Sequence, residues 1–126
     1  MRKIGSLQCL EAHPKQDPKM GQQTLHMLLF HGYGADAYDL RSLSEVIEGA
    51  EPIHFIFPQG PLEVPIGPGW TGRAWWPINV AALEAAAMSG KPRDLSLESP
   101  PELPVLRQKV IQSIESLKIP WNQIVL

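Results

Sequence analysis

Residues 31–34, with the sequence His-Gly-Tyr-Gly, have the types and spacing expected of a backbone anion-binding turn. They follow an apolar run at residues 25–30 and precede a predicted helix that Asp36 can cap. Glycines let the backbone adopt conformations closed to other residues and approach a ligand closely. The start of the following helix would add free N–H groups and the positive end of its dipole. We therefore expect this turn to face an anion.

Two kinds of anion suit such a turn. The first is a dinucleotide pyrophosphate, because Gly32, Gly34 and Ala37 match the pattern G-x-G-x-x-G/A. That motif also expects an acidic residue at the end of the next strand, whereas residues 57–59 are Phe-Pro-Gln, so the dinucleotide reading is disfavoured. The second is the transient oxyanion of an acyl-transfer reaction, for which the backbone N–H of Tyr33 is the donor.

Alternating strand and helix patterns surround this turn. Short, nearly continuous apolar runs are typical of strands buried on both faces. They occupy residues 25–30, 53–57 and 123–126, after a short first strand at 7–12. Helical spacing covers residues 37–48 and 104–118, and a shorter helix that Asn79 can cap is expected to run through Met88. The Pro- and Gly-rich residues 58–72 predict a long loop. This order predicts one α/β domain over residues 1–126, a parallel sheet with flanking helices.

Composition bounds the class of protein. The chain has 126 residues, 44% of them apolar, and a net charge of −2, which excludes a basic nucleic-acid binder. One cysteine, Cys9, forms no internal disulfide, and no apolar run reaches the roughly 18 residues of a membrane span. We find no signal peptide pattern and expect a cytoplasmic location.

Four ordered segments resemble the phospholipase/carboxylesterase family of α/β-hydrolases, which includes acyl-protein thioesterases. Residues 28–36 (Leu-Leu-Phe-His-Gly-Tyr-Gly-Ala-Asp) are similar to its His-Gly signature. Residues 57–61 resemble its strand-end Phe-Pro-x-x-Pro, residues 73–78 its Ala-Trp-aromatic-x-Ile segment, and residues 119–126 the entry to its nucleophile strand. The resemblance runs from about residue 25 to 126.

The resemblance implies an incomplete α/β-hydrolase fold that ends at the nucleophile strand. None of the eight serines lies in G-x-S-x-G, and the acid and histidine of the triad follow the serine in chain order. We therefore expect the N-terminal portion of a serine esterase that hydrolyses carboxylic ester or thioester bonds, inactive alone. The alternative is a non-enzymatic acyl- or lipid-binding half-domain, or one that a partner chain completes.

The resemblance also implies site residues. Tyr33 would supply an oxyanion-hole N–H, and the surrounding turn and a substrate wall would include His31, Gly32, Gly34, Trp75 and Trp76. His31, placed directly before Gly32, is expected to be a hydrogen-bonded structural residue and not a base. The substrate would be a small-molecule ester or acyl compound, and no cofactor is implied.

Two further expectations concern the rest of the chain. The four histidines, His13, His26, His31 and His54, show no paired spacing, so the sequence predicts no metal site. Residues 124–126 would form a core strand with an open edge, which predicts self-association.

Overall fold

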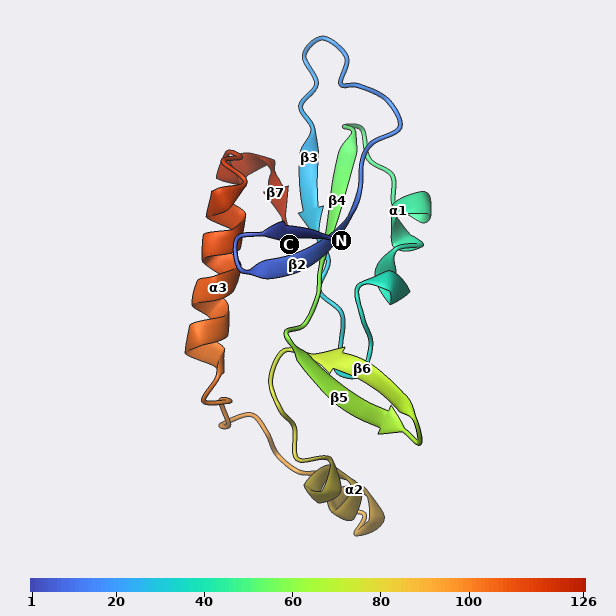
Figure 1. Ribbon diagram of the computed structural model, residues 1–126, viewed down its shortest axis with the longest axis vertical. Coiled ribbons are helices and arrows are strands. Elements are labelled where there is room, and N and C mark those ends of the chain that lie inside the picture. Colours follow the sequence, from blue (N-terminus) through green and yellow to red (C-terminus); the bar gives the residue numbers. More distant parts are fainter.

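The computed structural model describes all 126 residues, which form two sheets and a few helices (Figure 1). The strands are β1 (Arg2–Ile4), β2 (Leu7–Ala12), β3 (Leu25–Leu28), β4 (Ile53–Pro58), β5 (Leu62–Gly67), β6 (Trp70–Ala74) and β7 (Ile124–Val125). The α-helices are α1 (Leu43–Val46), α2 (Val80–Met88) and α3 (Leu103–Ser116), and two 3₁₀ segments are η1 (Tyr38–Leu40) and η2 (Trp121–Gln123).

The main sheet is mixed, and the prediction of a parallel sheet with flanking helices is wrong. Its strand order is β1-β2-β4-β3-β7, and β5 and β6 form a separate two-stranded sheet. The pairs β1–β2, β2–β4 and β5–β6 are antiparallel, whereas β3 pairs with both β4 and β7 in parallel. The physical reason lies in the N-terminal strands: β1 and β2 form a hairpin, which needs only a tight turn, and β2 joins the sheet beside β4 in the antiparallel direction.

Gly5 makes this hairpin turn and brings it against α3. The residue has a φ of +57°, and a Cβ at this position would lie 2.7 Å from the Ser113 backbone in α3. Only glycine meets both conditions without strain. The hairpin, which forms one edge of the main sheet, therefore packs directly against α3 (Figure 1).

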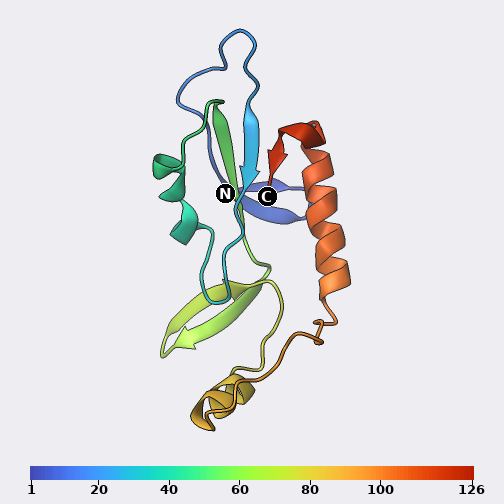
Figure 2. The ribbon, with the colours of Figure 1, turned by 180° about the vertical axis from the view of Figure 1, so that it is seen from behind.

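Each face of the main sheet has its own apolar core. On the α3 face, six buried side chains pack together: Ile4, Leu7, Cys9, Leu28, Ile56 and Ile114. On the α1 face, Phe55 and Phe57 pack with Ala37, and the partly buried Leu40 and Ile47 cover them. Figure 2 shows α1 and α3 on opposite sides of the sheet. Because successive strand residues point to opposite faces, β4 contributes to both cores.

The helix predicted over residues 37–48 is broken into η1 and α1. Neither segment contains a buried residue, and Ile47 is already extended, with φ −85° and ψ 118°. Short helices depend on burial of an apolar face for their stability, and this stretch buries too little to sustain a continuous helix. The predicted helix over 104–118 is confirmed by α3, and Asn79 caps α2 by accepting a hydrogen bond of 3.0 Å from the Ala82 N–H.

The predicted loop over residues 58–72 instead contains most of the β5–β6 hairpin. Its strands pair from Leu62–Ala74 to Gly67–Trp70, with a register irregularity between Pro65 and Gly67. A two-stranded ribbon has only edge strands, which tolerate proline. The proline and glycine content of residues 58–72 therefore does not exclude edge strands. The hairpin projects beyond the end of β4 (Figure 1).

Candidate functional site

The His31 side chain anchors the turn that follows β3. It is buried, at 3% exposure. Its Nε2 atom accepts a hydrogen bond of 2.9 Å from the Gly60 backbone N–H, so the ring proton is on Nδ1, which donates to the Gly32 carbonyl at 2.8 Å. Both ring nitrogens are thus used within the chain. His31 holds the turn against the segment that follows β4 and has no free nitrogen to act as a base.

Residues 73–75, at the end of β6 and just after it, also form hydrogen bonds with the turn. The Trp75 indole N–H donates to the His31 carbonyl at 2.8 Å. The Gly34 N–H donates to the Arg73 carbonyl at 2.8 Å, and the Arg73 N–H donates to the Ala35 carbonyl at 3.0 Å. The turn is therefore joined to β6, the strand that sequence analysis treated as loop.

Gly72 allows this close approach. A Cβ on Gly72 would lie only 2.0 Å from the Gly34 carbonyl oxygen, and a Cβ on Gly60 would lie 2.7 Å from the Ala74 carbonyl oxygen. Gly34 itself has a φ of +82°, which favours glycine. Three glycines from three segments thus permit the backbone contacts that fix the turn.

The N–H groups of Gly32 and Tyr33 make no hydrogen bond within the chain. A Cβ on Gly32 would meet no atom within 4 Å, so the space beside it is open. Two successive backbone donors without partners, in a turn fixed on both sides, are suited to donate to an oxyanion or a carbonyl oxygen. The Tyr33 side chain is 38% exposed, and no hydrogen bond of its hydroxyl is found.

The start of the following helix does not add to this anion site, which corrects the expectation from the sequence. The Asp36 carboxylate accepts hydrogen bonds from the N–H groups of Tyr38 (2.8 Å) and Asp39 (3.2 Å), and the Asp39 carboxylate accepts one from the Asp36 N–H (2.9 Å). The Gln59 side chain accepts from the Ala37 N–H at 2.7 Å. Asp39 lies in the first turn of η1, as predicted, but the N-cap position of η1 is Ala37 and not Asp36. The segment is short and its donors are occupied.

The two adjacent tryptophans, Trp75 and Trp76, are both half-buried. The Trp75 ring lies 5.4 Å from Phe30 and 5.2 Å from His31, centroid to centroid, and packs against the core on the α3 face. Its indole N–H donates the hydrogen bond to the His31 carbonyl that is described above. Trp76 follows it in the chain without a recorded hydrogen bond or aromatic contact.

One cleft lies away from this turn. It has a volume of about 520 Å³ and is lined mainly by polar residues of the segments 12–22 and 41–55, at the opposite end of β4. A second cleft of about 460 Å³ lies closer to the turn, with Gln59, Gly60 and Arg73 in its wall. The turn is the stronger candidate site, because the N–H groups of Gly32 and Tyr33 are unpaired there.

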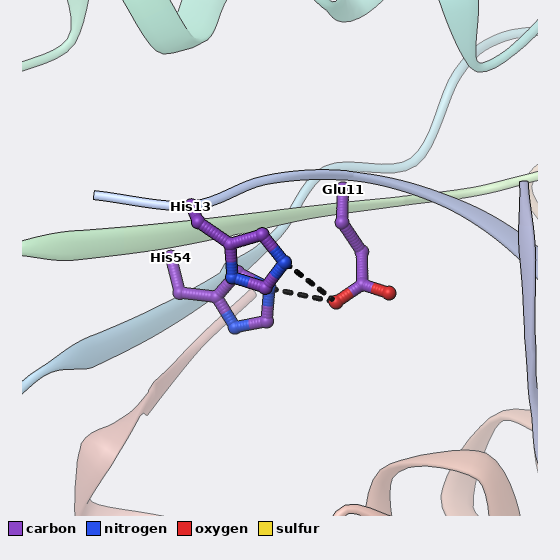
Figure 3. A group of neighbouring side chains, drawn as sticks. All are labelled: Glu11, His13 and His54. Carbon is purple, nitrogen blue, oxygen red and sulfur yellow. Dashed lines mark hydrogen bonds and ion pairs between the residues drawn. The ribbon is translucent and has the colours of Figure 1, made fainter. Parts of the chain in front are cut away.

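A second group of polar side chains lies at the other end of the sheet (Figure 3). Glu11 is in β2, His54 is in β4, and His13 directly follows β2. The Glu11 Oε2 atom lies 2.9 Å from His54 Nε2 and 3.8 Å from His13 Nε2. The rings of His13 and His54 stack with centroids 4.5 Å apart and planes 9° apart. We call these three residues the Glu-His-His cluster.

Two neighbours extend the Glu-His-His cluster. The Arg2 Nε atom is 2.5 Å from the other Glu11 oxygen, Oε1, and this ion pair is the main reason that the pKa of Glu11 is lowered. On the opposite side, His26 Nδ1 lies 2.9 Å from His54 Nδ1. Burial lowers the pKa of both His26 and His54, which favours neutral imidazoles.

Sequence analysis missed this cluster because strand register creates it. The parallel pair β3–β4 places His26 beside His54, and the antiparallel pair β2–β4 places Ala12 beside Phe55. If the antiparallel β2–β4 register is continued by one residue, His13 lies opposite His54. A usable signal was present, since each of the two buried runs has a histidine at its second position (Leu25-His26 and Ile53-His54).

Comparison with models of protein families, with curated proteins and with solved structures yields no match to this chain. The helices of this chain include none with both the length and the apolar character needed to cross a membrane. The assignment of a function therefore depends on the geometry of the turn and on the sequence resemblance.

Proposed function

We propose that this chain contributes the oxyanion-binding turn and part of the substrate wall of a serine esterase that acts on carboxylic ester or thioester bonds. The observation that carries the proposal is the pair of unpartnered N–H groups at Gly32 and Tyr33, held in an anchored turn at the carboxyl end of β3. The resemblance of residues 28–36 to the His-Gly signature of phospholipases and carboxylesterases supports the same chemistry.

In such a reaction, a serine attacks the substrate carbonyl and its oxygen becomes an oxyanion. The Tyr33 N–H, and with it the Gly32 N–H, would donate to that oxygen when its negative charge develops. Removal of one such donor typically costs about 10²–10³ in kcat, which is why a rigid turn matters. The hydrogen bonds of His31 and Trp75 keep the turn in place without entering the chemistry.

The chain itself has no G-x-S-x-G segment, so it needs a serine from further sequence or from a second chain. The proposal is tested by determining the coding sequence downstream of codon 126, in all three reading frames, and expressing the chain with that extension. We expect a G-x-S-x-G motif there and hydrolysis of p-nitrophenyl butyrate or a butyryl thioester by the extended protein. The 126-residue chain should be inactive and should not react with a fluorophosphonate probe. An extension without this motif, together with no hydrolysis by the extended protein, would contradict a serine supplied in the same chain and favour the partner-completed or acyl-binding alternative.

A further inference from the structure

We propose that the Glu-His-His cluster binds a divalent transition-metal ion, with Zn²⁺ as the best-fitting occupant. One ligand atom from each of Glu11, His13 and His54 lies within 4.8 Å of the other two, and Glu11 Oε2 lies 3.8 Å from His13 Nε2 and 2.9 Å from His54 Nε2. Zinc bonds of 2.0–2.2 Å in a tetrahedral site place ligand atoms roughly 3.3 Å apart. The separations of 2.9 and 3.8 Å from Glu11 Oε2 bracket that value, so small side-chain movements suffice.

The cluster combines two fixed ligands with one adjustable ligand. The side chains of Glu11 and His54 are each 9% exposed and come from paired strands, whereas that of His13 is 73% exposed and lies just beyond β2. In Figure 3 the two imidazoles are stacked and both approach the same carboxylate oxygen. An ion requires the His13 ring to tilt so that both Nε2 lone pairs converge. The exposure of this side chain leaves it free to do so.

Arg2 prepares the carboxylate for a single metal bond. Its Nε atom pairs with Glu11 Oε1, which leaves Oε2 directed at the histidines. The Arg2 Nη2 atom also donates to Oε2 at 3.1 Å, a contact that metal binding would weaken. Because the Arg2 side chain is 60% exposed, that contact can be lost at little cost. Glu11 would then bind as a monodentate ligand.

His26 completes the site as the outer partner of His54. Without metal, the carboxylate can only accept, so His54 Nε2–H donates to Glu11 and His54 Nδ1 accepts from His26 Nδ1–H. When a metal takes His54 Nε2, the His54 proton moves to Nδ1 and donates to His26 Nδ1. His26 then carries its proton on Nε2. Each ring keeps one proton, so the exchange is balanced and leaves His54 in the orientation that metal-bound histidines usually have.

The ligand set of two histidines and one carboxylate leaves a fourth position, which water or an anion would occupy. The exposure of His13 places this position toward solvent. The cluster lies near the start of β4, whereas Gly60, which anchors the oxyanion turn, follows the end of that strand. The metal site is thus separate from the proposed esterase function and does not depend on it.

The test uses untagged protein, stripped with a chelator, in isothermal titration with Zn²⁺ and absorption spectroscopy with Co²⁺. We expect one ion per chain and the visible d–d bands of a four-coordinate Co²⁺ ion. His13→Ala and Glu11→Gln should each weaken Zn²⁺ binding at least tenfold, and His26→Leu should weaken it about 10–100-fold, as loss of an outer partner does. Cys9→Ser is the matched control, because Cys9 lies two residues from Glu11 in the same strand, and should bind like the unaltered chain.

His13→Ala keeps the test decisive, since an exposed side chain beyond a strand is not needed for folding. Circular dichroism verifies the fold of each variant. Absence of Zn²⁺ binding by the unaltered chain would overturn the proposal. Undiminished binding by folded His13→Ala, or loss of binding in a Cys9→Ser variant whose fold is intact, would equally overturn it, because the ion would then lie elsewhere.

Discussion

His31 Nε2 accepts a 2.9 Å hydrogen bond from the backbone N–H of Gly60, 29 residues further along the chain. The bond is buried and joins the turn after β3 to the segment after β4. Since β3 and β4 are parallel neighbours, their carboxyl ends lie side by side. This hydrogen bond links the segments that follow the two strands. It fixes the turn that carries the free N–H groups of Gly32 and Tyr33.

Replacement of His31 should destabilise the fold. His31→Ala removes the acceptor and leaves the buried Gly60 N–H unpaired, which typically costs about 1–3 kcal/mol. Urea unfolding followed by tryptophan fluorescence measures this loss, with chelator present. His13→Ala is the control and should change the unfolding free energy by no more than about 0.5 kcal/mol, because that side chain is exposed. Equal effects of the two substitutions would contradict the anchoring role of His31.

Gly72→Ala should disrupt the contact between β6 and the turn. The new Cβ would lie 2.0 Å from the Gly34 carbonyl oxygen, so the backbone must move. Overpacking of this kind typically costs about 1–3 kcal/mol or more. Gly32→Ala is a matched control, because its Cβ would meet open space. Thermal unfolding should show a clearly lower Tm for Gly72→Ala only; an unchanged Tm would mean that the strand and turn are not in contact.

Tyr33 should act through its backbone in the extended, serine-containing protein. Tyr33→Phe keeps the N–H and should retain most of kcat, whereas Tyr33→Pro deletes the donor and should lower kcat by about 10²–10³. The measurement is steady-state hydrolysis of p-nitrophenyl butyrate, with circular dichroism as the check on folding. Equal and severe loss in both folded variants would assign the effect to the phenol side chain.

Cys9 should be unreactive in the native chain. Its side chain is buried in the core on the α3 face, and burial raises the pKa of the thiol to about 11. At pH 8 only about a thousandth of the thiol is thiolate, the reactive form. Reaction with a disulfide reagent at pH 8 should be slow in buffer and immediate in guanidinium chloride. Rapid labelling of the folded chain would show that this core is open.

The chain should self-associate through the outer edge of β7. This strand ends the sheet order, and Val125 and Leu126 are exposed, at 38% and 73%. An exposed apolar edge strand is a template for pairing with another chain, and a net charge of −2 offers little repulsion. Size-exclusion chromatography with light scattering should give a mass above 14.0 kDa.

Val125→Lys should shift this mass toward the monomer, because a charged edge disfavours strand pairing. Val46→Lys, at a 73% exposed position in α1 away from the edge, is the matched control and should leave association unchanged. A monomeric unaltered chain would refute the prediction.

Local patterns located the strands β3 and β4 and the helix α3. The runs at 25–30 and 53–57 predicted β3 and β4, and the apolar spacing over 104–118 predicted α3. Residues 37–48 and 58–72 were misread for opposite reasons. In the first, the residues at helical spacing are only partly buried against the sheet, which does not sustain a continuous helix. In the second, proline and glycine masked strands that pair only with each other.

The sequence by itself determined which runs form the buried strands β3 and β4, where Asn79 caps α2, and that a glycine turn follows β3, because these depend on residues close in the chain. Only the tertiary structure decided that the sheet is mixed and that the turn is anchored by Gly60, Arg73 and Trp75. The same holds for Glu11, His13 and His54, which strand register alone brings together. Pairing partners and register arise from the simultaneous burial of several strands, and no single segment contains that information.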